Sequence, residues 1–130
     1  MAEKLAIMIV SEEYEKSHVA SMIASVAAVS GIDVSIFVTG NAVFNFLKKN
    51  VEKKNFTGGK LYDLIKEKKA TLFYELFDQA KMLGGLKIYV CSMVMDICGL
   101  EKDDLLDIVD DHLGLAAFLG IMEGAETITF

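Results

Sequence analysis

The amino-acid sequence predicts an α/β fold: a three-layer α/β/α sandwich around a five-stranded, mostly parallel sheet. Short runs of β-branched, aliphatic and aromatic residues alternate with segments of helical spacing, which is the pattern of a parallel sheet with helical crossovers. Apolar residues make up 53% of the 130 residues, as expected for a sheet covered on both faces. The chain has no proline, internal repeat or low-complexity linker. These observations favour a single domain over residues 1–130.

The first strand and helix are predicted from the opening residues. Residues 4–10, KLAIMIV, form a short apolar run typical of a strand. Acidic residues follow, and either Ser11 or Ser17 can cap the helix that begins there. Residues 18–30 are rich in Ala, Val, Met and Ile and predict a helix. Gly31 is well suited to end it.

The second strand is predicted over residues 33–38, DVSIFV, which are dense in β-branched and aromatic side chains. Residues 39–41 turn the chain, and residues 42–50 predict a second helix. Residues 50–70 are polar and rich in lysine, so we expect a surface excursion with a short helix over residues 61–68.

The central part of the chain predicts a helix, a strand and a second helix in close succession. Apolar residues recur at helical spacing over residues 71–83. Residues 86–90 form a buried strand that ends on Cys91. Residues 92–98 continue as a short helix, which Gly99 stops in the left-handed conformation.

The last part of the chain predicts two more strands around one helix. Residues 105–109 form a short fourth strand, and residues 110–112 form the next turn. A helix follows over residues 113–123 and ends at Gly124. Residues 126–130, ETITF, alternate and predict the last strand.

Charge is distributed unevenly along the chain. The net charge is −6, and all 13 basic residues are lysine, which argues against specific recognition of nucleic acid by arginine. Residues 48–69 hold eight lysines and three acidic residues, whereas residues 101–111 hold six acidic residues and one lysine. These segments are either solvated surface or docking surfaces, and we expect the lysine-rich one to steer an anionic partner or substrate.

The composition also indicates a cytoplasmic protein. No apolar run reaches the roughly 18 residues that span a bilayer, so no membrane association is expected. The first residues do not have the pattern of a secretion signal. Two cysteines do not form a disulfide framework, which points to a reducing compartment.

Cys91 is the strongest candidate for a functional residue. It lies where a strand is followed by the N-terminus of a helix, and unpaired N–H groups there favour the thiolate, the reactive form of cysteine. We expect Cys91 to be partly exposed at the carboxyl edge of the sheet, where open parallel sheets bind ligands. The alternative is that Cys91 is only a small buried hydrophobic residue. The same edge is expected to gather residues 11–14, 39–41, 91–93 and 110–112.

The second cysteine is expected to have a structural role. On one helix Cys91 and Cys98 would lie about 10 Å apart at 1.5 Å per residue, too far for a disulfide, which needs less than about 7 Å. We therefore expect Cys98 to face the core and to react slowly. Met93 and Met95 are expected to pack in the core or in an interface.

Other chemistries find little support in the residue pattern. The cysteines and the two histidines, His18 and His112, do not have the spacing of a zinc site, so no metal is expected. A Cys–His or Ser–His–Asp hydrolase would require His112 to fold back onto Cys91, and a surface histidine beside Asp110 and Asp111 is preferred. No nucleotide-binding glycine motif is present, and no cofactor is expected.

The chain resembles the DsrE/DsrF-like sulfur-relay family, in particular its single-chain branch labelled peroxiredoxin-like, with TusD and DsrE as relatives. The resemblance covers residues 5–130. It is carried by the CSMVMD motif that begins at Cys91 with Gly99 and Leu100 after it, the acidic segment of residues 101–106, residues 114–116 and the closing residues 127–130. Cys98 and the lysine-rich residues 50–70 depart from the family pattern.

The resemblance implies a three-layer sandwich, assembly into homo-oligomers such as trimers or hexamers, and a cysteine at the Cys91 position that carries sulfur as a persulfide or thiosulfonate. It also implies TusA-like or rhodanese-like sulfur carrier proteins as partners. The high apolar content of so short a chain independently favours a homo-oligomer.

Together the residues and the resemblance predict a cysteine-based sulfur carrier, with sulfurtransferase activity as an open question. Cys91 is the catalytic candidate, and the substrate-binding candidates are Ser92, Met93, Ser11, Thr39 and Gly40. Two alternatives stay open: a non-catalytic assembly or regulatory subunit, and a thiol-based peroxide reductase that would need a resolving thiol.

Overall fold

The computed structural model describes residues 3–130, and within them five parallel strands form one sheet. They are β1 (Lys4–Ile9), β2 (Asp33–Val38), β3 (Leu86–Cys91), β4 (Asp111–Leu113) and β5 (Glu126–Thr129). Their order across the sheet is β4-β3-β2-β1-β5, and every neighbouring pair is parallel. All strands therefore present their carboxyl ends at one edge of the sheet.

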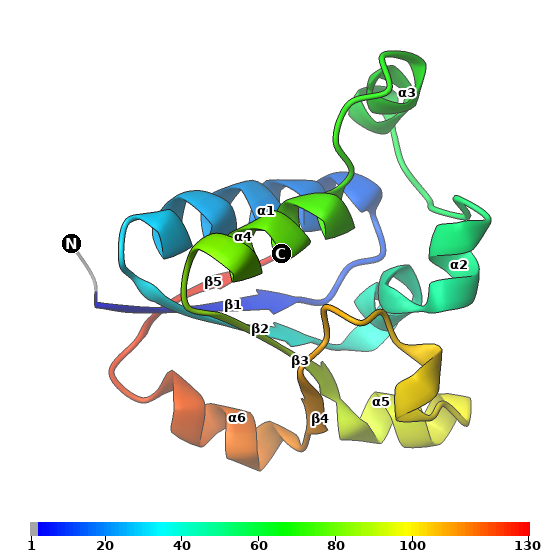
Figure 1. The fold of residues 1–130 in the computed structure, drawn as a ribbon. Helices are drawn as coiled ribbons and strands as arrows, with labels where there is room; N and C mark the ends of the chain where they lie inside the picture. Colours follow the sequence, from blue (N-terminus) through cyan, green and yellow to red (C-terminus); the bar gives the residue numbers. More distant parts are fainter. Residues whose placement is uncertain (1–2) are drawn as a thin grey trace.

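Helices cover both faces of this sheet, as the sequence predicts (Figure 1). The long helices α1 (Tyr14–Val29) and α4 (Phe73–Leu83) lie side by side on one face. Helix α6 (Leu115–Met122) covers the other face, and α5 (Ser92–Cys98) lies on that side, next to the carboxyl end of β3. The predicted three-layer α/β/α sandwich is confirmed.

The alternation of side chains along β3 divides the core into two parts. Leu86, Ile88 and Val90 belong to the large cluster beneath α1 and α4. Tyr89 and Cys91 point to the opposite face, where a small cluster forms around Phe118 of α6. The larger cluster carries most of the buried aromatic side chains.

The fourth strand lies later in the chain than the sequence suggests. The structure has β4 at Asp111–Leu113, and the predicted strand over residues 105–109 is wrong. Those apolar residues are buried as an irregular segment after a short 3₁₀ helix, η2 (Lys102–Asp104). Asp110 then fixes the start of β4, because its backbone N–H donates to the carbonyl oxygen of Ile88 and its carboxylate accepts the backbone N–H of Ile88.

Two helices also begin at other residues than predicted. The helix predicted over residues 42–50 is split into η1 (Gly40–Phe46) and α2 (Lys48–Glu52), because Leu47 between them is extended and forms an isolated β-bridge with Leu105. Helix α6 starts after Leu113, which belongs to β4.

Helix α1 begins at Tyr14 and ends as predicted, with Gly31 at a φ of +85°. Neither proposed serine caps it. The Ser11 hydroxyl instead accepts a hydrogen bond from the backbone N–H of Glu13, and the Ser17 hydroxyl is buried inside the helix.

The lysine-rich excursion is an ordered part of the fold. It contains α2 and α3 (Lys60–Glu67), and α3 projects from the body at the top of Figure 1. Glu15 of α1 accepts hydrogen bonds from the backbone N–H groups of Gly59 (2.6 Å) and Tyr62 (3.0 Å), and the rings of Tyr14 and Tyr62 stack with centroids 4.3 Å apart. The start of α1 therefore anchors the predicted helix of residues 61–68, which is confirmed as α3. Among residues 3–130, no helix has both the length and the apolar character needed to cross a bilayer.

Candidate functional site

Cys91 lies at the junction that the sequence predicts. It is the last residue of β3 and the N-cap of α5, with an extended backbone (φ −63°, ψ 117°). Ser92 opens α5, and Gly99 ends it with a φ of +65°, as expected. The first N–H groups of α5 have no acceptor within the helix.

The exposure of Cys91 differs from the prediction. Cys91 lies at the carboxyl edge of the sheet, as predicted, but only 7% of the residue is exposed, so the predicted partial exposure of the thiol is wrong. Strand alternation turns Cys91 toward the face covered by α6, where it packs in one cluster with Phe37 and the fully buried Phe118. The thiol is therefore screened by the α6 layer.

The second thiol also differs, because Cys98 is exposed rather than buried. Helix α5 lies at the rim of the molecule, and Met95 is its only buried residue. Met93 is 70% exposed and Ile97 is 76% exposed, so Met93 does not pack in the core of this chain. Core packing is confirmed for Met95, whereas packing of Met93 in an interface stays a prediction.

The substrate-binding candidates Thr39 and Gly40 follow β2, the strand next to β3, and Ser11 follows β1, one strand further from β3. Val38 pairs with Val90 on one side and with Ile9 on the other. The residues that come next, Cys91, Thr39 and Val10, therefore follow one another along the carboxyl edge at the strand spacing of about 4.8 Å. Ser11 lies one residue beyond Val10, so these candidates form a row that runs away from Cys91 across two strands.

The turn at Gly40 brings the loops after β1 and β2 into contact. Gly40 has a φ of +55°, and a side chain there would approach the carbonyl oxygen of Val10 to 3.0 Å. The Val10 oxygen also accepts a hydrogen bond from the backbone N–H of Ala42 (3.1 Å). Gly40 is thus required by close backbone approach, which is a structural role.

His112 lies closer to the cysteine motif than its place in the sequence suggests. In the register of β4, His112 pairs with Val90 and Leu113 pairs with Cys91. The Nδ1 atom of His112 is 3.0 Å from the hydroxyl oxygen of Ser92, the residue directly after Cys91. From the sequence, His112 is expected to be a surface residue of a turn, and only the shifted position of β4 reveals this contact.

Asp111 does not complete a Ser–His–Asp relay with this pair. Its Oδ1 atom is 4.0 Å from His112 Nε2, which is too long for a hydrogen bond. The same oxygen accepts the backbone N–H of His112 (2.8 Å), and this bond, together with the nearby Lys102 ammonium, lowers the pKa of the Asp111 carboxyl. The hydrolase alternative therefore gains no support from the geometry.

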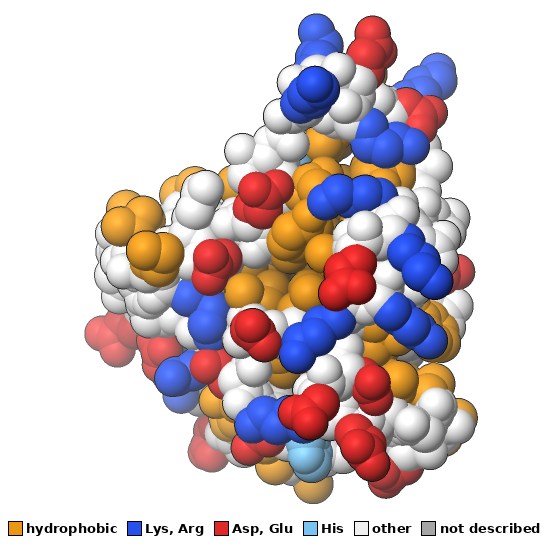
Figure 2. Space-filling model, turned by 45° about the vertical axis from the view of Figure 1, so that its right-hand side comes forward, with side chains coloured by type: hydrophobic (Ala, Val, Ile, Leu, Met, Phe, Trp, Pro, Cys, Tyr) orange, Lys and Arg blue, Asp and Glu red, His pale blue; other side chains and the backbone are white. Residues whose placement is uncertain are grey.

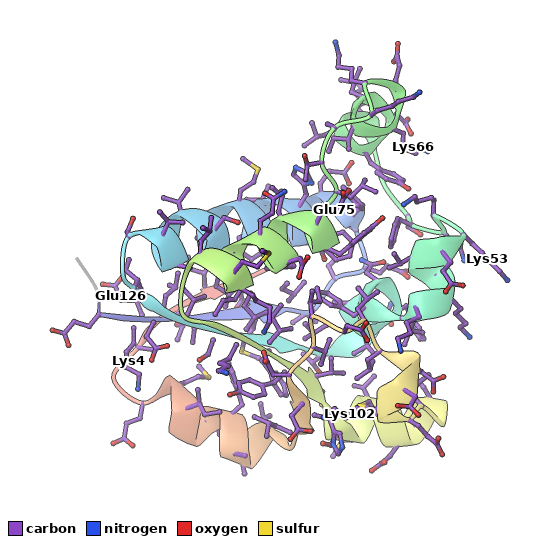
Figure 3. All side chains as sticks on the ribbon, in the orientation of Figure 1. Lys4, Lys53, Lys66, Glu75, Lys102 and Glu126 are labelled. Atoms are coloured by element: carbon purple, nitrogen blue, oxygen red, sulfur yellow. The ribbon has the colours of Figure 1, made fainter. Side chains whose placement is uncertain are left out.

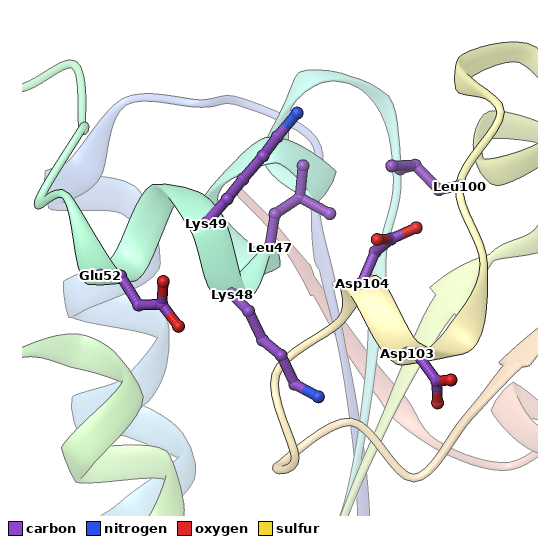
Figure 4. Close-up of a pocket in the computed structure, with 7 residues that line it drawn as sticks. All are labelled: Leu47, Lys48, Lys49, Glu52, Leu100, Asp103 and Asp104. Carbon is purple, nitrogen blue, oxygen red and sulfur yellow. The ribbon is translucent and has the colours of Figure 1, made fainter.

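A depression of about 230 Å³ lies between α2 and η2 (Figure 4). Lys48, Lys49 and Glu52 approach it from α2, while Asp103 and Asp104 approach it from η2. Its charges are of mixed sign, and Cys91 is not among the residues that line it. Within residues 3–130 no group of three or more His, Cys, Asp or Glu side chains is arranged to hold a metal ion.

Comparison with known proteins places the chain among proteins of the same fold. The uncharacterized protein YrkE of Bacillus subtilis (strain 168) is 27% identical over 93% of this chain and 92% of its own length. The YchN protein of E. coli superimposes with a TM-score of 0.65 at 16% identity over the whole of both chains. MTH1491 of Methanobacterium thermoautotrophicum, a protein of unknown function, superimposes with a TM-score of 0.57 at 18% identity over 98% of both chains. A family model matches residues 4–130, and the chain belongs to the DsrE/DsrF-like family.

Proposed function

We propose that this protein relays sulfane sulfur through Cys91. Membership of the DsrE/DsrF-like family suggests sulfur relay in general terms. The observation that carries the finer proposal is the position of Cys91 at the end of β3 and at the N-terminus of α5. In this proposal the backbone N–H groups of the first turn of α5, which have no acceptor within the helix, stabilise the terminal anion of the persulfide after loading.

The proposed reaction has two thiol exchange steps. In the first, the Cys91 thiolate attacks the sulfane sulfur of a donor persulfide, R–S–S⁻, forms a Cys91 persulfide and releases R–S⁻. In the second, an acceptor thiolate attacks the terminal sulfur, so that the acceptor leaves as a persulfide and the Cys91 thiolate is restored. Neither step needs a cofactor or a change in the total number of electrons.

Each candidate substrate-binding residue has a proposed role beside Cys91. Ser92 and Met93 lie in the first turn of α5, and the Ser92 hydroxyl is held by His112. Thr39 and Gly40 follow the neighbouring strand β2, and Ser11 follows β1. In this proposal they form the surface along which a donor or acceptor approaches.

The burial of Cys91 sets a condition on this function. A donor can reach a 7% exposed thiol only if α5 or α6 moves. The same burial is the observation that favours the alternative of a non-catalytic assembly or regulatory subunit. For the peroxide reductase alternative, Cys98 is exposed but lies at the opposite end of α5 from Cys91, too distant for a disulfide within one chain, so the resolving thiol would have to come from another chain.

We propose a homo-oligomer, a trimer or hexamer, for the assembled protein. Large apolar side chains on both α5 and α6 are exposed in the single chain, and an assembly would remove them from water. TusA-like or rhodanese-like carrier proteins are the proposed sulfur donors or acceptors.

The test is the mass of the intact protein after incubation with thiosulfate, tetrathionate or polysulfide. The wild type and Cys98→Ser should gain sulfur, whereas Cys91→Ser should gain none at the corresponding position. Sulfur loading of Cys91→Ser at the wild-type rate would move the function to Cys98. Absence of any sulfur adduct, with rapid oxidation of Cys91 by peroxide, would favour the peroxide reductase.

A further inference from the structure

A second pocket lies between the end of α3 and the start of α4, on the side of the sheet opposite to the face on which Cys91 packs. Its volume is about 380 Å³, within the range of small-molecule sites. Ile65 and Tyr62, which are buried, and Leu72 give it an apolar base. Figure 2 shows apolar side chains at the bottom of a hollow below the projecting α3, with lysine side chains beside it.

Three lysines line this pocket: Lys54, Lys66 and Lys69. The only acidic lining residue is Glu75, labelled with Lys66 in Figure 3, and its Oε1 atom is occupied by the backbone N–H of Leu72 (3.1 Å). The ammonium of Lys66 lies 4.4 Å from the centre of the Tyr62 ring and 3.6 Å from Asp63 Oδ1. The pocket therefore combines an apolar base with excess positive charge.

Lys54 and Lys69 share an unusual backbone conformation. Their φ angles are +52° and +53°, and they are the two non-glycine residues with positive φ among residues 3–130. A side chain in this left-handed region is strained by contact with its own backbone. Asn and Asp can offset this strain because their short polar side chains form hydrogen bonds with the local backbone, which the long lysine side chain does not do.

Both lysines occupy the same position at the end of a helix. The N–H groups of Lys54 and Asn55 donate to the carbonyl oxygens of Val51 and Asn50 after α2. After α3, the N–H groups of Lys69 and Ala70 donate to Lys66 and Ile65 in the same pattern. This is the Schellman motif, in which glycine is the usual left-handed residue.

The chain itself uses glycine for this purpose at two other helix ends. Gly31 after α1 and Gly99 after α5 have positive φ and the same pair of backbone hydrogen bonds. Glycine at positions 54 and 69 would make the folded chain more stable, because glycine adopts a positive φ without strain. Both positions nevertheless carry lysine, and both lysines line one pocket. Strain held at a binding surface is a recognised mark of function.

We propose that this pocket binds a small organic anion. A flat apolar portion of the ligand packs on Tyr62, Ile65 and Leu72, and its carboxylate or phosphate group is held by Lys54, Lys66 and Lys69. The inference does not depend on sulfur transfer at Cys91, which lies beneath the other face of the sheet.

The experiment titrates the full-length protein with phenyl phosphate, followed by ¹H–¹⁵N NMR and calorimetry. Saturable binding is expected, with shifts confined to residues that line the pocket. Inorganic phosphate, which has the charge alone, and phenol, which has the ring alone, should each bind at least about tenfold more weakly.

Two pairs of variants separate the pocket from general charge. Lys54→Gly with Lys69→Gly should weaken phenyl phosphate binding at least about tenfold and should raise the melting temperature, because the strain is relieved. The matched control is Lys53→Gly with Lys68→Gly, which removes the same charge from the preceding residues. Both control residues are right-handed (φ −86°) and lie outside the pocket lining, and Figure 3 shows Lys53 extending outward from the end of α2.

The control pair should retain its affinity for phenyl phosphate and should melt at a lower temperature. Equal loss of affinity in both pairs would overturn the proposal in favour of unspecific attraction by the lysines. Failure of phenyl phosphate to bind the wild type, with saturable binding of hexaglutamate, would overturn it in favour of an acidic protein partner. Absence of saturable binding by either probe would also overturn it.

Discussion

The two faces of the sheet are covered in very different ways. On one face α1 alone buries eight residues and packs beside α4 over a cluster that includes Phe46, Phe73 and Phe77. On the other face α6 buries a single residue, Phe118. Apolar residues on the outer side of α6, such as Leu119, which is 58% exposed, are largely open to solvent in the single chain.

Because of this difference, the stability of the fold and the reactivity of the Cys91 thiol depend on different faces of the sheet. The face of α1 and α4 supplies most of the buried apolar surface and holds the sheet in place. The face of α6 covers Cys91 with one anchored helix, so a local opening there can expose the thiol without unfolding the chain. The following predictions test this division, from the largest expected effect to the smallest.

Truncation of the buried rings of Phe118 and Phe77 should have similar effects on stability, but only one of the two changes should affect the reactivity of the Cys91 thiol. Phe118→Ala and Phe77→Ala should each lower the free energy of unfolding by about 3–5 kcal/mol. Only Phe118→Ala should accelerate modification of Cys91, because of the two rings only Phe118 packs in the cluster of Cys91. The measurements are urea unfolding and labelling by a chromogenic disulfide, in a Cys98→Ser background. Equal acceleration in both variants would mean that Cys91 reacts through global unfolding.

The two cysteines should respond differently to serine. Cys91→Ser places a hydroxyl in an apolar cluster and should lower the free energy of unfolding by about 1–3 kcal/mol. Cys98→Ser lies on the surface and should change it by less than about 0.5 kcal/mol. Urea unfolding under reducing conditions measures both values. A larger loss for Cys98→Ser would contradict the exposure of the α5 rim.

A pH-dependent loss of stability should originate on the face of the sheet that α1 and α4 cover, because α1 carries the buried His18. Burial lowers the pKa of His18, and Glu15 opposes this only in part. The Tyr14 hydroxyl accepts the N–H of Phe73 and has its own proton free for the Nδ1 atom of a neutral His18, 3.3 Å away. Protonation therefore favours the unfolded chain, whose histidine titrates near pH 6.5.

The free energy of unfolding should not depend on His18 above about pH 6.5, where this histidine is neutral in both states. It should decrease as the pH falls below that value, with a slope of at most about 1.4 kcal/mol per pH unit. Urea midpoints between pH 7.5 and 5 test this, and His18→Gln should flatten the profile. An unchanged slope in His18→Gln would assign the effect to other groups.

The smallest effect on the folded monomer should come from the outer side of α6. Leu119→Ser should change the free energy of unfolding of dilute protein by less than about 0.5 kcal/mol, because the side chain is largely exposed. If α6 lies in the proposed homo-oligomer interface, the same variant should reduce the mass measured by light scattering. A wild-type protein that stays monomeric at tens of micromolar, as an approximate range, would remove the homo-oligomer proposal.

Most of the fold could be predicted because four strands have an apolar signal of their own. β1, β2, β3 and β5 coincide with the predicted runs to within two residues at each end. β4 has no such signal, since Asp111 and His112 are exposed and Leu113 is only partly buried. It forms because the edge of β3 offers hydrogen bonds in register. The apolar side chains among residues 105–109 are buried or partly buried without forming a strand.

The site was predictable in position and unpredictable in exposure. The place of Cys91 follows from local pattern, because a buried strand runs directly into a short helix. Its burial depends on where Phe118 packs, which is a tertiary contact far along the chain. The left-handed Lys54 and Lys69 gave no local signal either, because the residue type predicts the opposite conformation.

The pairing of β1 with β5 affects how the chain can fold while it is being synthesised. Leu5 pairs with Glu126 and Met8 with Thr129, so one side of β1 is satisfied only by the last residues of the described chain. A chain emerging from the ribosome can join β1 to β2 and β2 to β3 early, but it carries an open edge on β1, a strand that is largely apolar on both faces, until residues 126–129 have emerged. Such an edge favours association between incomplete chains. We expect chains that stop at Gly124 to be recovered mainly as aggregates, and a soluble, folded product of that length would show that β5 is dispensable.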